Sequence, residues 1–374
     1  MTPDPTRIED LATPALLLDE AKMTRNIERL AARARALGVS LRPHLKTAKC
    51  TEIARRLGGG MPGPITVSTL AEAEVFHAAG HDDILYAVGI APQKLARVQA
   101  LREGGCDLTV ILDSPEQAKA VVEARVPALI EIDSDGHRGG RRAEDPALIE
   151  IGRILHGTEC LRGVMTHAGE SYGVRGEAAH AAFAERERCA VVAAAEALRR
   201  DGLPCPVVSV GSTPTAHAAR DLTGVTDLRA GVYMFFDLVM AGIEVCKTED
   251  IALSVLTTVI GHQRDKGWVM IDAGWMAMSR DRGTAAQDVD QGYGLVCDVE
   301  GRVLDDLIVG SANQEHGIVS LRPGADAALP DLPIGTRLRI LPNHACATAA
   351  QHDRYHLLPA ADGALKVWHR FGGW

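Results

Sequence analysis

A lysine and a histidine–cysteine pair are the residue types in this sequence best suited to chemistry. Lys46 lies in the segment 41–49, LRPHLKTAK, where a short apolar strand is expected to end and a helix to begin. A lysine amine in such a place can form a Schiff base with an aldehyde cofactor. Far along the chain, His344 and Cys346 supply an imidazole and a thiol, which are good ligands for a borderline-soft metal ion. Together these groups indicate carbon-acid chemistry at an amino acid, with a metal ion assisting a poor leaving group.

Both features also have an ordinary interpretation. Most lysines are solvated surface residues, although the neighbouring cations Arg42 and Lys49 favour a reactive amine because nearby positive charge lowers the pKa of a lysine. A histidine two residues before a cysteine is usually a hydrogen-bonded side chain beside a buried thiol. On an extended chain, however, His344 and Cys346 point to the same side. Two protein ligands are too few for a structural zinc, so a metal ion here would keep open positions for water or substrate.

The composition is that of an ordinary soluble globular protein. The chain has 374 residues, of which 46% are hydrophobic and 24% charged, enough for two domains. The net charge of −9 and the lack of a long basic block disfavour a nucleic-acid partner. No apolar run is long enough to span a membrane, and the first ten residues lack the apolar segment of a secretory signal. Eight cysteines without a CxxC pair are expected to stay reduced in the cytoplasm.

From about residue 20 to 245, short β-branched runs alternate with amphipathic helical stretches. This alternation predicts an α/β fold with a parallel sheet, most simply a closed (β/α)₈ barrel. A doubly wound open sheet is the alternative, but no GxGxxG turn favours it. The expected strands are 39–42, 65–67, 84–87, 108–112, 128–132, 163–166, 207–210 and 228–233, and the expected helices include 23–37, 69–79, 92–103, 115–123, 146–155 and 178–201.

The pattern changes after about residue 245, where strand-like runs are separated by Gly, Asp and Pro and little helical periodicity remains. The expected strands there are 251–260, 268–271, 303–309, 337–341 and 355–358, which predicts a second, mainly antiparallel β domain. The early strand 15–19 precedes the first helix and is expected to pair with that domain. The expected organisation is therefore a barrel over 20–245 and a β domain formed by 1–19 and 246–374.

Polar and glycine residues follow several of the expected barrel strands. Active sites of such barrels lie at the C-terminal ends of the strands. Small residues and hydroxyls where a strand turns into a helix can bind a phosphate through backbone N–H groups and side-chain donors. The candidate residues at these strand ends are Lys46, Arg138, His167, Tyr172, Gly211, Ser212, Thr213, Arg229 and Gly231.

Eight short segments in a fixed order also carry a family resemblance. They are RPHLKT at 42–47, DGHR at 135–138, HAGESY at 167–172, GST at 211–213, RAGVY at 229–233, DAG at 272–274, QEHG at 314–317 and PNHAC at 342–346. Over essentially its whole length the sequence resembles the D-serine dehydratase and D-threonine aldolase group of fold-type III pyridoxal phosphate enzymes, which share the alanine racemase architecture.

The resemblance implies a set of site residues. Lys46 would bind pyridoxal 5'-phosphate covalently and act as the catalytic base. His344 and Cys346 would bind a divalent metal ion, with zinc expected first and manganese, cobalt or magnesium as substitutes. The family's aldolases usually carry Asp at the position matching Cys346, so the thiol favours a dehydratase and zinc. The residues implied in cofactor binding are Lys46, Arg138, His167, Tyr172, Gly211, Ser212, Thr213, Arg229, Gly231 and Tyr233.

The activity that the resemblance implies is loss of water from a β-hydroxy D-amino acid. D-threo-3-hydroxyaspartate, giving oxaloacetate and ammonia, is the expected substrate, and D-serine, giving pyruvate, is a further one. A homodimer with shared active sites is also implied. Three alternatives remain: a retro-aldol lyase that gives glycine and an aldehyde, a racemase with Tyr293 as second base, and a cofactor-binding protein without activity. The β domain argues against the last, because such proteins resemble the barrel alone.

Overall fold

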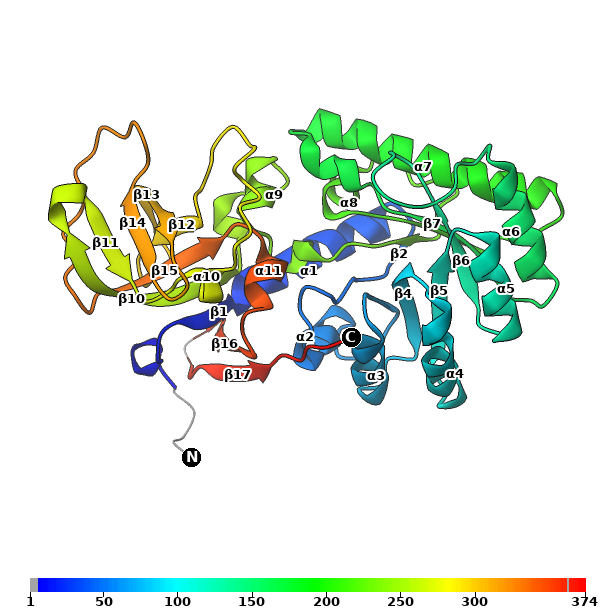
Figure 1. The fold of residues 1–374 in the computed structure, drawn as a ribbon, viewed down its shortest axis with the longest axis horizontal. Coiled ribbons are helices and arrows are strands. Elements are labelled where there is room, and N and C mark those ends of the chain that lie inside the picture. Colours follow the sequence, from blue (N-terminus) through cyan, green and yellow to red (C-terminus); the bar gives the residue numbers. More distant parts are fainter. Residues whose placement is uncertain (1–5, 362) are drawn as a thin grey trace. The chain divides into compact units, whose positions relative to one another are not determined.

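The protein forms two compact units, as seen in a computed structural model that describes residues 6–361 and 363–374 (Figure 1). The barrel unit comprises Glu28–Gly231 and Phe371–Trp374, and the β unit comprises the described residues up to Ile27 together with Val232–Arg370. The boundaries between the units fall after Ile27 and after Gly231, whereas the sequence predicted them after residues 19 and 245. Residues 1–5 of the expected segment 1–19 lie outside the described residues.

The barrel unit is built on eight strands that all pair in parallel, in the order β2-β9-β8-β7-β6-β5-β4-β3, which confirms the predicted parallel barrel. Backbone hydrogen bonds from segment 43–45 to Thr66 join the two end strands. The strands are β2 Ser40–Leu41, β3 Ile65–Val67, β4 Asp83–Gly89, β5 Asp107–Leu112, β6 Ala128–Ile132, β7 Leu161–Thr166, β8 Val207–Val210 and β9 Asp227–Leu228. The expected strand 228–233 is shorter than predicted, because the chain leaves the sheet at Arg229 and forms a 3₁₀ turn at Val232–Met234.

The helices of this part of the chain follow the apolar periodicity and the capping residues. For example, α5 begins as expected at Pro115, because Ser114 accepts a hydrogen bond from the Gln117 amide at 3.2 Å and proline suits the first helical position. The helices are α1 Glu20–Ala36, α2 Thr51–Leu57, α3 Leu70–Ala78, α4 Leu95–Glu103, α5 Pro115–Glu123, α6 Pro146–His156, α7 Glu177–Arg200 and α8 Thr213–Ala218.

The β unit contains a mainly antiparallel sheet in the order β11-β14-β13-β12-β15-β10-β1-β16-β17, and β10 pairs again with β11. The early strand β1 pairs with β10 and β16, which confirms that it belongs to the C-terminal sheet. The sequence pattern did not predict β12, β14 and β17, which are short runs beside glycine or in the last residues. The strands are β1 Ala15–Asp19, β10 Leu253–Gln263, β11 Trp268–Ile271, β12 Gly294–Cys297, β13 Val303–Ala312, β14 Gly317–Leu321, β15 Arg337–Pro342, β16 Arg354–Leu358 and β17 Lys366–His369, with helices α9 Leu238–Gly242, α10 Trp275–Met278 and α11 Ala345–Ala349. Within the described ranges, no helix is both long and apolar enough to cross a membrane.

Candidate active site

Lys46 lies just beyond β2, with its side chain exposed at the C-terminal end of the barrel strands. Its backbone N–H donates to His44 Nδ1 at 3.4 Å, and the other ring nitrogen of His44 lies 3.3 Å from Ser68 Oγ. Burial lowers the pKa of His44 well below its ordinary value, and the positive charges of Lys46 and Arg229 lower it further. The His44 imidazole is therefore neutral beside the lysine.

The two cations expected to act on Lys46 are engaged elsewhere. Arg42 forms ion pairs with Asp83 at 2.7 Å and with Asp227 at 3.2 Å. Lys49 pairs with the buried carboxylate of Glu72 at 3.2 Å. Carboxylates therefore balance both of these charges.

The glycine at the end of β8 is required by a close approach between backbone segments. Gly211 has a φ of +142°, and a Cβ atom there would lie 1.8 Å from the carbonyl oxygen of Arg229. No side chain fits at that distance. Gly231 is similarly tight, because its Cβ would lie 3.1 Å from the His44 carbonyl oxygen. The predicted phosphate loop thus packs directly against the segment that leaves β9.

The polar groups of this loop are only partly satisfied within the protein. Ser212 caps α8 by accepting from the Thr215 amide at 3.3 Å, and its own N–H donates to Thr215 Oγ1 at 3.1 Å. Thr213 Oγ1 is buried and has no hydrogen-bond partner in the described part of the chain. Since a buried hydroxyl without a partner is costly, this atom fits a site that a ligand oxygen completes. The hydroxyl of Thr213 therefore fits a phosphate, whereas the N–H groups of Gly211 and Ser212, expected as phosphate donors, bond inside the protein.

The other predicted cofactor residues of the barrel unit gather at the same strand ends. His167 Nδ1 donates to the Gly211 carbonyl at 2.8 Å, and its ring centroid lies 6.4 Å from that of Tyr172. Burial lowers the pKa of His167 to about 3, with Arg138 and Arg229 adding positive charge. Arg229 is buried and donates through Nε to Ser209 Oγ at 2.7 Å and through a terminal nitrogen to the Thr166 carbonyl. Arg138 is exposed and pairs with Glu131 at 3.5 Å.

One buried carboxylate in this region is not among the residues predicted from the sequence. Glu187 of α7 accepts hydrogen bonds from the backbone N–H groups of Gly211 at 2.9 Å and of Ala168 at 3.1 Å. Burial raises the pKa of Glu187. A signal did exist, because Glu187 falls at helical spacing between Ala184 and Val191 on the apolar face of α7.

The predicted metal ligands lie in the β unit. His344 and Cys346 interact, and His344 Nδ1 also lies 2.7 Å from Asp281 Oδ2. Burial lowers the pKa of His344, but the hydrogen bonds with Asp281 and Cys346 outweigh it and raise the pKa to about 11. The expected extended chain at this pair is wrong: α11 begins at Ala345, whose N–H donates to the buried carboxylate of Asp237 at 2.9 Å.

The donor set of this pair suits a catalytic metal ion. Asp281, which is not among the residues predicted from the sequence, hydrogen-bonds Nδ1 of His344, so that Nε2 is the nitrogen that faces a metal ion. Among the described residues no group of three or more His, Cys, Asp or Glu side chains could hold an ion. An ion bound by His344 and Cys346 would therefore take its remaining ligands from water or substrate.

Tyr233, the last predicted cofactor residue, also belongs to the β unit. Its side chain is fully buried, and its hydroxyl has no hydrogen-bond partner among the residues that the structure describes. Burial raises the pKa of Tyr233. A buried hydroxyl of this kind again fits a ligand contact.

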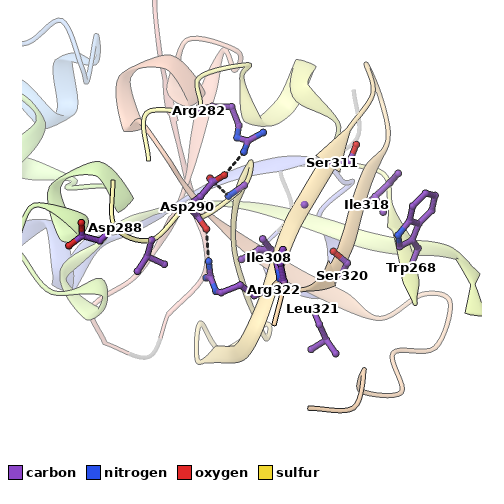
Figure 2. Close-up of a pocket in the computed structure, with 14 residues that line it drawn as sticks. Trp268, Arg282, Asp288, Asp290, Ile308, Ser311, Ile318, Ser320, Leu321 and Arg322 are labelled. Carbon is purple, nitrogen blue, oxygen red and sulfur yellow. Dashed lines mark hydrogen bonds and ion pairs between the residues drawn. The ribbon is translucent and has the colours of Figure 1, made fainter. Parts of the chain in front are cut away.

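A cavity of about 530 Å³ in the β unit contains none of the predicted site residues (Figure 2). Its charged lining residues pair with one another or with nearby polar groups, since Arg282 lies 2.7 Å from Asp290 and Arg322 donates to Gln291 at 2.6 Å. Arg282 also lies over the ring of Tyr293, 5.1 Å from its centroid. Neither His344 nor Cys346 lines this cavity, although its lining residue Arg282 follows Asp281, the partner of His344, in the chain.

Comparisons with known proteins give a consistent result. The family model "Alanine racemase, N-terminal domain" matches residues 18–239, and the model "Putative serine dehydratase domain" matches residues 252–358. The chain is 56% identical to D-threo-3-hydroxyaspartate dehydratase of Delftia sp. (strain HT23), over 97% of this chain and 98% of that protein. It is 31% identical to a D-threonine aldolase of Arthrobacter sp., over 95% and 91%.

Solved structures agree with these matches. A histidine-to-alanine mutant of D-threo-3-hydroxyaspartate dehydratase is 55% identical and superposes with a TM-score of 0.96, covering 99% of this chain and 97% of the other. A cysteine-to-alanine mutant in the metal-free form is 55% identical with a TM-score of 0.94, covering 98% and 99%.

Proposed function

The chain belongs to the family of alanine racemase-fold enzymes that includes D-threo-3-hydroxyaspartate dehydratase, and from this premise we propose that it removes water from a β-hydroxy D-amino acid. D-threo-3-hydroxyaspartate is the proposed substrate, with oxaloacetate and ammonia as products, and D-serine, giving pyruvate, is a second one. The observation that carries the proposal is the 56% identity to a dehydratase over nearly the whole chain, against 31% to an aldolase. Cys346 supports the same choice, because the aldolases usually carry Asp at that position.

The product assay tests this function directly. Purified protein supplied with pyridoxal phosphate and zinc is expected to convert D-threo-3-hydroxyaspartate into a keto acid and ammonia in equal amounts. A retro-aldol lyase would instead give glycine and an aldehyde, and a racemase would give the other configuration at Cα without either product. Chromatography of the amino acids together with an ammonia assay distinguishes the three. Glycine as the main product would contradict the proposal.

Pyridoxal 5'-phosphate, when bound, supplies the electron sink that makes the Cα proton of an amino acid removable. We assign its covalent attachment to the Lys46 amine, which then takes the Cα proton onto Nζ. The phosphate is assigned to the loop of Gly211, Ser212 and Thr213, because the Thr213 hydroxyl is buried and has no hydrogen-bond partner among the described residues. Arg138 and Arg229, whose charges both act on His167, are the proposed neighbours of the ring.

The proposed metal ligands are His344 Nε2 and Cys346 Sγ, and zinc is the proposed ion because it prefers imidazole and thiolate. Manganese, cobalt or magnesium would be substitutes. A metal ion there supplies a Lewis acid for the β-hydroxyl, which is otherwise a poor leaving group. The two solved dehydratase mutants support this assignment, because they alter a histidine and a cysteine two positions apart and the cysteine mutant is described as metal-free.

Asp281→Asn is expected to weaken metal binding by about 10- to 100-fold, because an amide is a poorer partner for His344 Nδ1 than a carboxylate. The measurement is zinc affinity by competition with a chromophoric chelator. Asp290→Asn is the matched control, since Asp290 pairs with Arg282 rather than with a proposed ligand. Equal zinc affinity of Asp281→Asn and the parent protein would contradict the role given to Asp281.

We propose a homodimer in which the two chains share active sites. Lys46 belongs to the barrel unit and His344 to the β unit, so a complete site needs both units, which one chain or two chains could supply. The family resemblance favours two chains. The proposed compartment is the cytoplasm. None of the eight cysteines, all of which the structure describes, forms a disulfide bond, and this suits a reducing environment.

A mixture of inactive Lys46→Ala and inactive Cys346→Ala proteins is expected to recover part of the activity after subunit exchange. In a mixed dimer with shared sites, one site combines the intact lysine of one chain with the intact metal ligands of the other. Differently tagged subunits and native mass spectrometry verify that exchange has occurred. Confirmed exchange without recovery would place each site within one chain.

A further inference from the structure

Glu187 is a buried glutamate for which the proposed chemistry has no use. It lies near the middle of α7, and only 2% of its surface is exposed. Its Oε1 accepts two backbone N–H groups, from Ala168 in the loop after β7 and from Gly211 in the loop after β8. One side-chain atom therefore joins two loops that belong to different strands of the barrel.

The Glu187 carboxyl group also connects to the hydroxyls of the phosphate loop. Glu187 hydrogen-bonds the side chain of Thr215, whose Oγ1 lies 2.9 Å from Ser212 Oγ. Ser212 Oγ lies 2.9 Å from Ser171 Oγ, which in turn donates to the Ala168 carbonyl at 2.7 Å. These bonds form a closed, buried ring. It runs from Glu187 through Thr215, Ser212 and Ser171 to Ala168, and the Ala168 N–H returns to Glu187.

The arrangement decides which groups remain free for a ligand. Because Glu187 takes the Gly211 N–H and Thr215 takes the Ser212 N–H, the loop presents hydroxyls rather than those amides. Thr213 Oγ1 keeps no partner in the described part of the chain. Glu187 and Thr215 thus bond the loop backbone, and the Thr213 hydroxyl remains for the ligand.

We propose that Glu187 is a positioning residue which holds the phosphate loop in its binding conformation by hydrogen bonds that a glutamine could also make. The inference rests on the proposed function, since the ligand of this loop is taken to be the phosphate of pyridoxal phosphate. Oε1 accepts from the two backbone N–H groups, and the carboxyl group also hydrogen-bonds the Thr215 hydroxyl. Burial raises the pKa of Glu187.

The test compares cofactor forms with and without the phosphate. Apo-protein is titrated with pyridoxal phosphate and with pyridoxal, and the melting temperature of the apo-protein is recorded. Glu187→Ala leaves two buried N–H groups without an acceptor, so its affinity for pyridoxal phosphate is expected to fall at least about tenfold, while its affinity for pyridoxal stays unchanged. Glu187→Gln is expected to stay within about threefold of the parent, because its amide oxygen accepts both N–H groups and its NH₂ can donate to Thr215.

Leu198→Ala is the matched control for loss of α7 packing. Leu198 is fully buried on the same helix and faces Gly152 of α6, away from the loops. This variant should lower the melting temperature without changing the affinity for pyridoxal phosphate. If Glu187→Ala does not fold, Thr215→Val is the second variant, because it removes the hydroxyl that bonds Glu187. It should lower the affinity for pyridoxal phosphate more than the affinity for pyridoxal.

Two results would overturn the inference. One is an equal loss of affinity for pyridoxal phosphate and for pyridoxal in Glu187→Ala or Thr215→Val, which would mean that these residues have a general structural role. The other is an affinity for pyridoxal phosphate that is as low in Glu187→Gln as in Glu187→Ala, which would mean that the loop needs a carboxylate and not only its hydrogen bonds. Failure of the proposed function would look different, because the parent protein itself would then show no covalent binding of pyridoxal phosphate at Lys46.

Discussion

Lys46→Ala is expected to abolish covalent cofactor binding and to lower turnover at least about a thousandfold, because the same amine attaches the cofactor and moves the Cα proton. The parent protein should be yellow, and its colour should disappear in the variant. Borohydride reduction followed by peptide mapping identifies the lysine that carries the cofactor.

Lys49→Ala is the matched control for this experiment. Lys49 lies three residues away in the same segment, but its amine pairs with Glu72. The control should keep the absorbance of the bound cofactor. A cofactor-linked peptide that contains another lysine would contradict the assignment of Lys46.

Removal of the metal ion, or Cys346→Ala, is expected to slow water loss by at least about three orders of magnitude while leaving cofactor absorbance intact. The ion acts only on the β-hydroxyl, whereas cofactor attachment depends on Lys46 in the barrel unit. Exchange of the Cα proton with solvent should survive better than product formation, because it precedes cleavage of the C–O bond. Keto acid formation and proton exchange by NMR are measured on the same samples.

Cys189→Ala controls for the loss of a thiol, since Cys189 is an exposed cysteine on α7. It should retain both metal and activity. If protein shown to be metal-free by elemental analysis forms keto acid at the full rate, then His344 and Cys346 are structural residues.

Local pattern was sufficient to predict much of the fold. Strand β6 was predicted within its observed bounds, because five consecutive apolar or buried positions between turn signals are typical of a parallel strand covered on both faces. The strand ends that carry Lys46, His167 and Gly211 followed from the same alternation, since each strand delivers its next residues to one edge of the barrel. These features depend on neighbours in the chain, which a sequence displays directly.

Contacts between distant segments could not be predicted in this way. The Asp281 carboxylate reaches His344 across 63 positions, and Glu187 reaches Gly211 across 24. Neither distance follows from a period or a turn, because the packing of whole elements brings these atoms together.

The sequence by itself therefore determined the alternating elements, the polar strand ends and the residue types that can bind a cofactor and a metal ion. Only the tertiary structure decided which groups are free. It pairs Arg42 with Asp83, bonds the Gly211 amide to Glu187 and gives the Thr213 hydroxyl no partner within residues 6–361 and 363–374. The physical reason is that a hydrogen bond or an ion pair depends on a separation of about 3 Å, which is set by the packing of side chains from several elements at once.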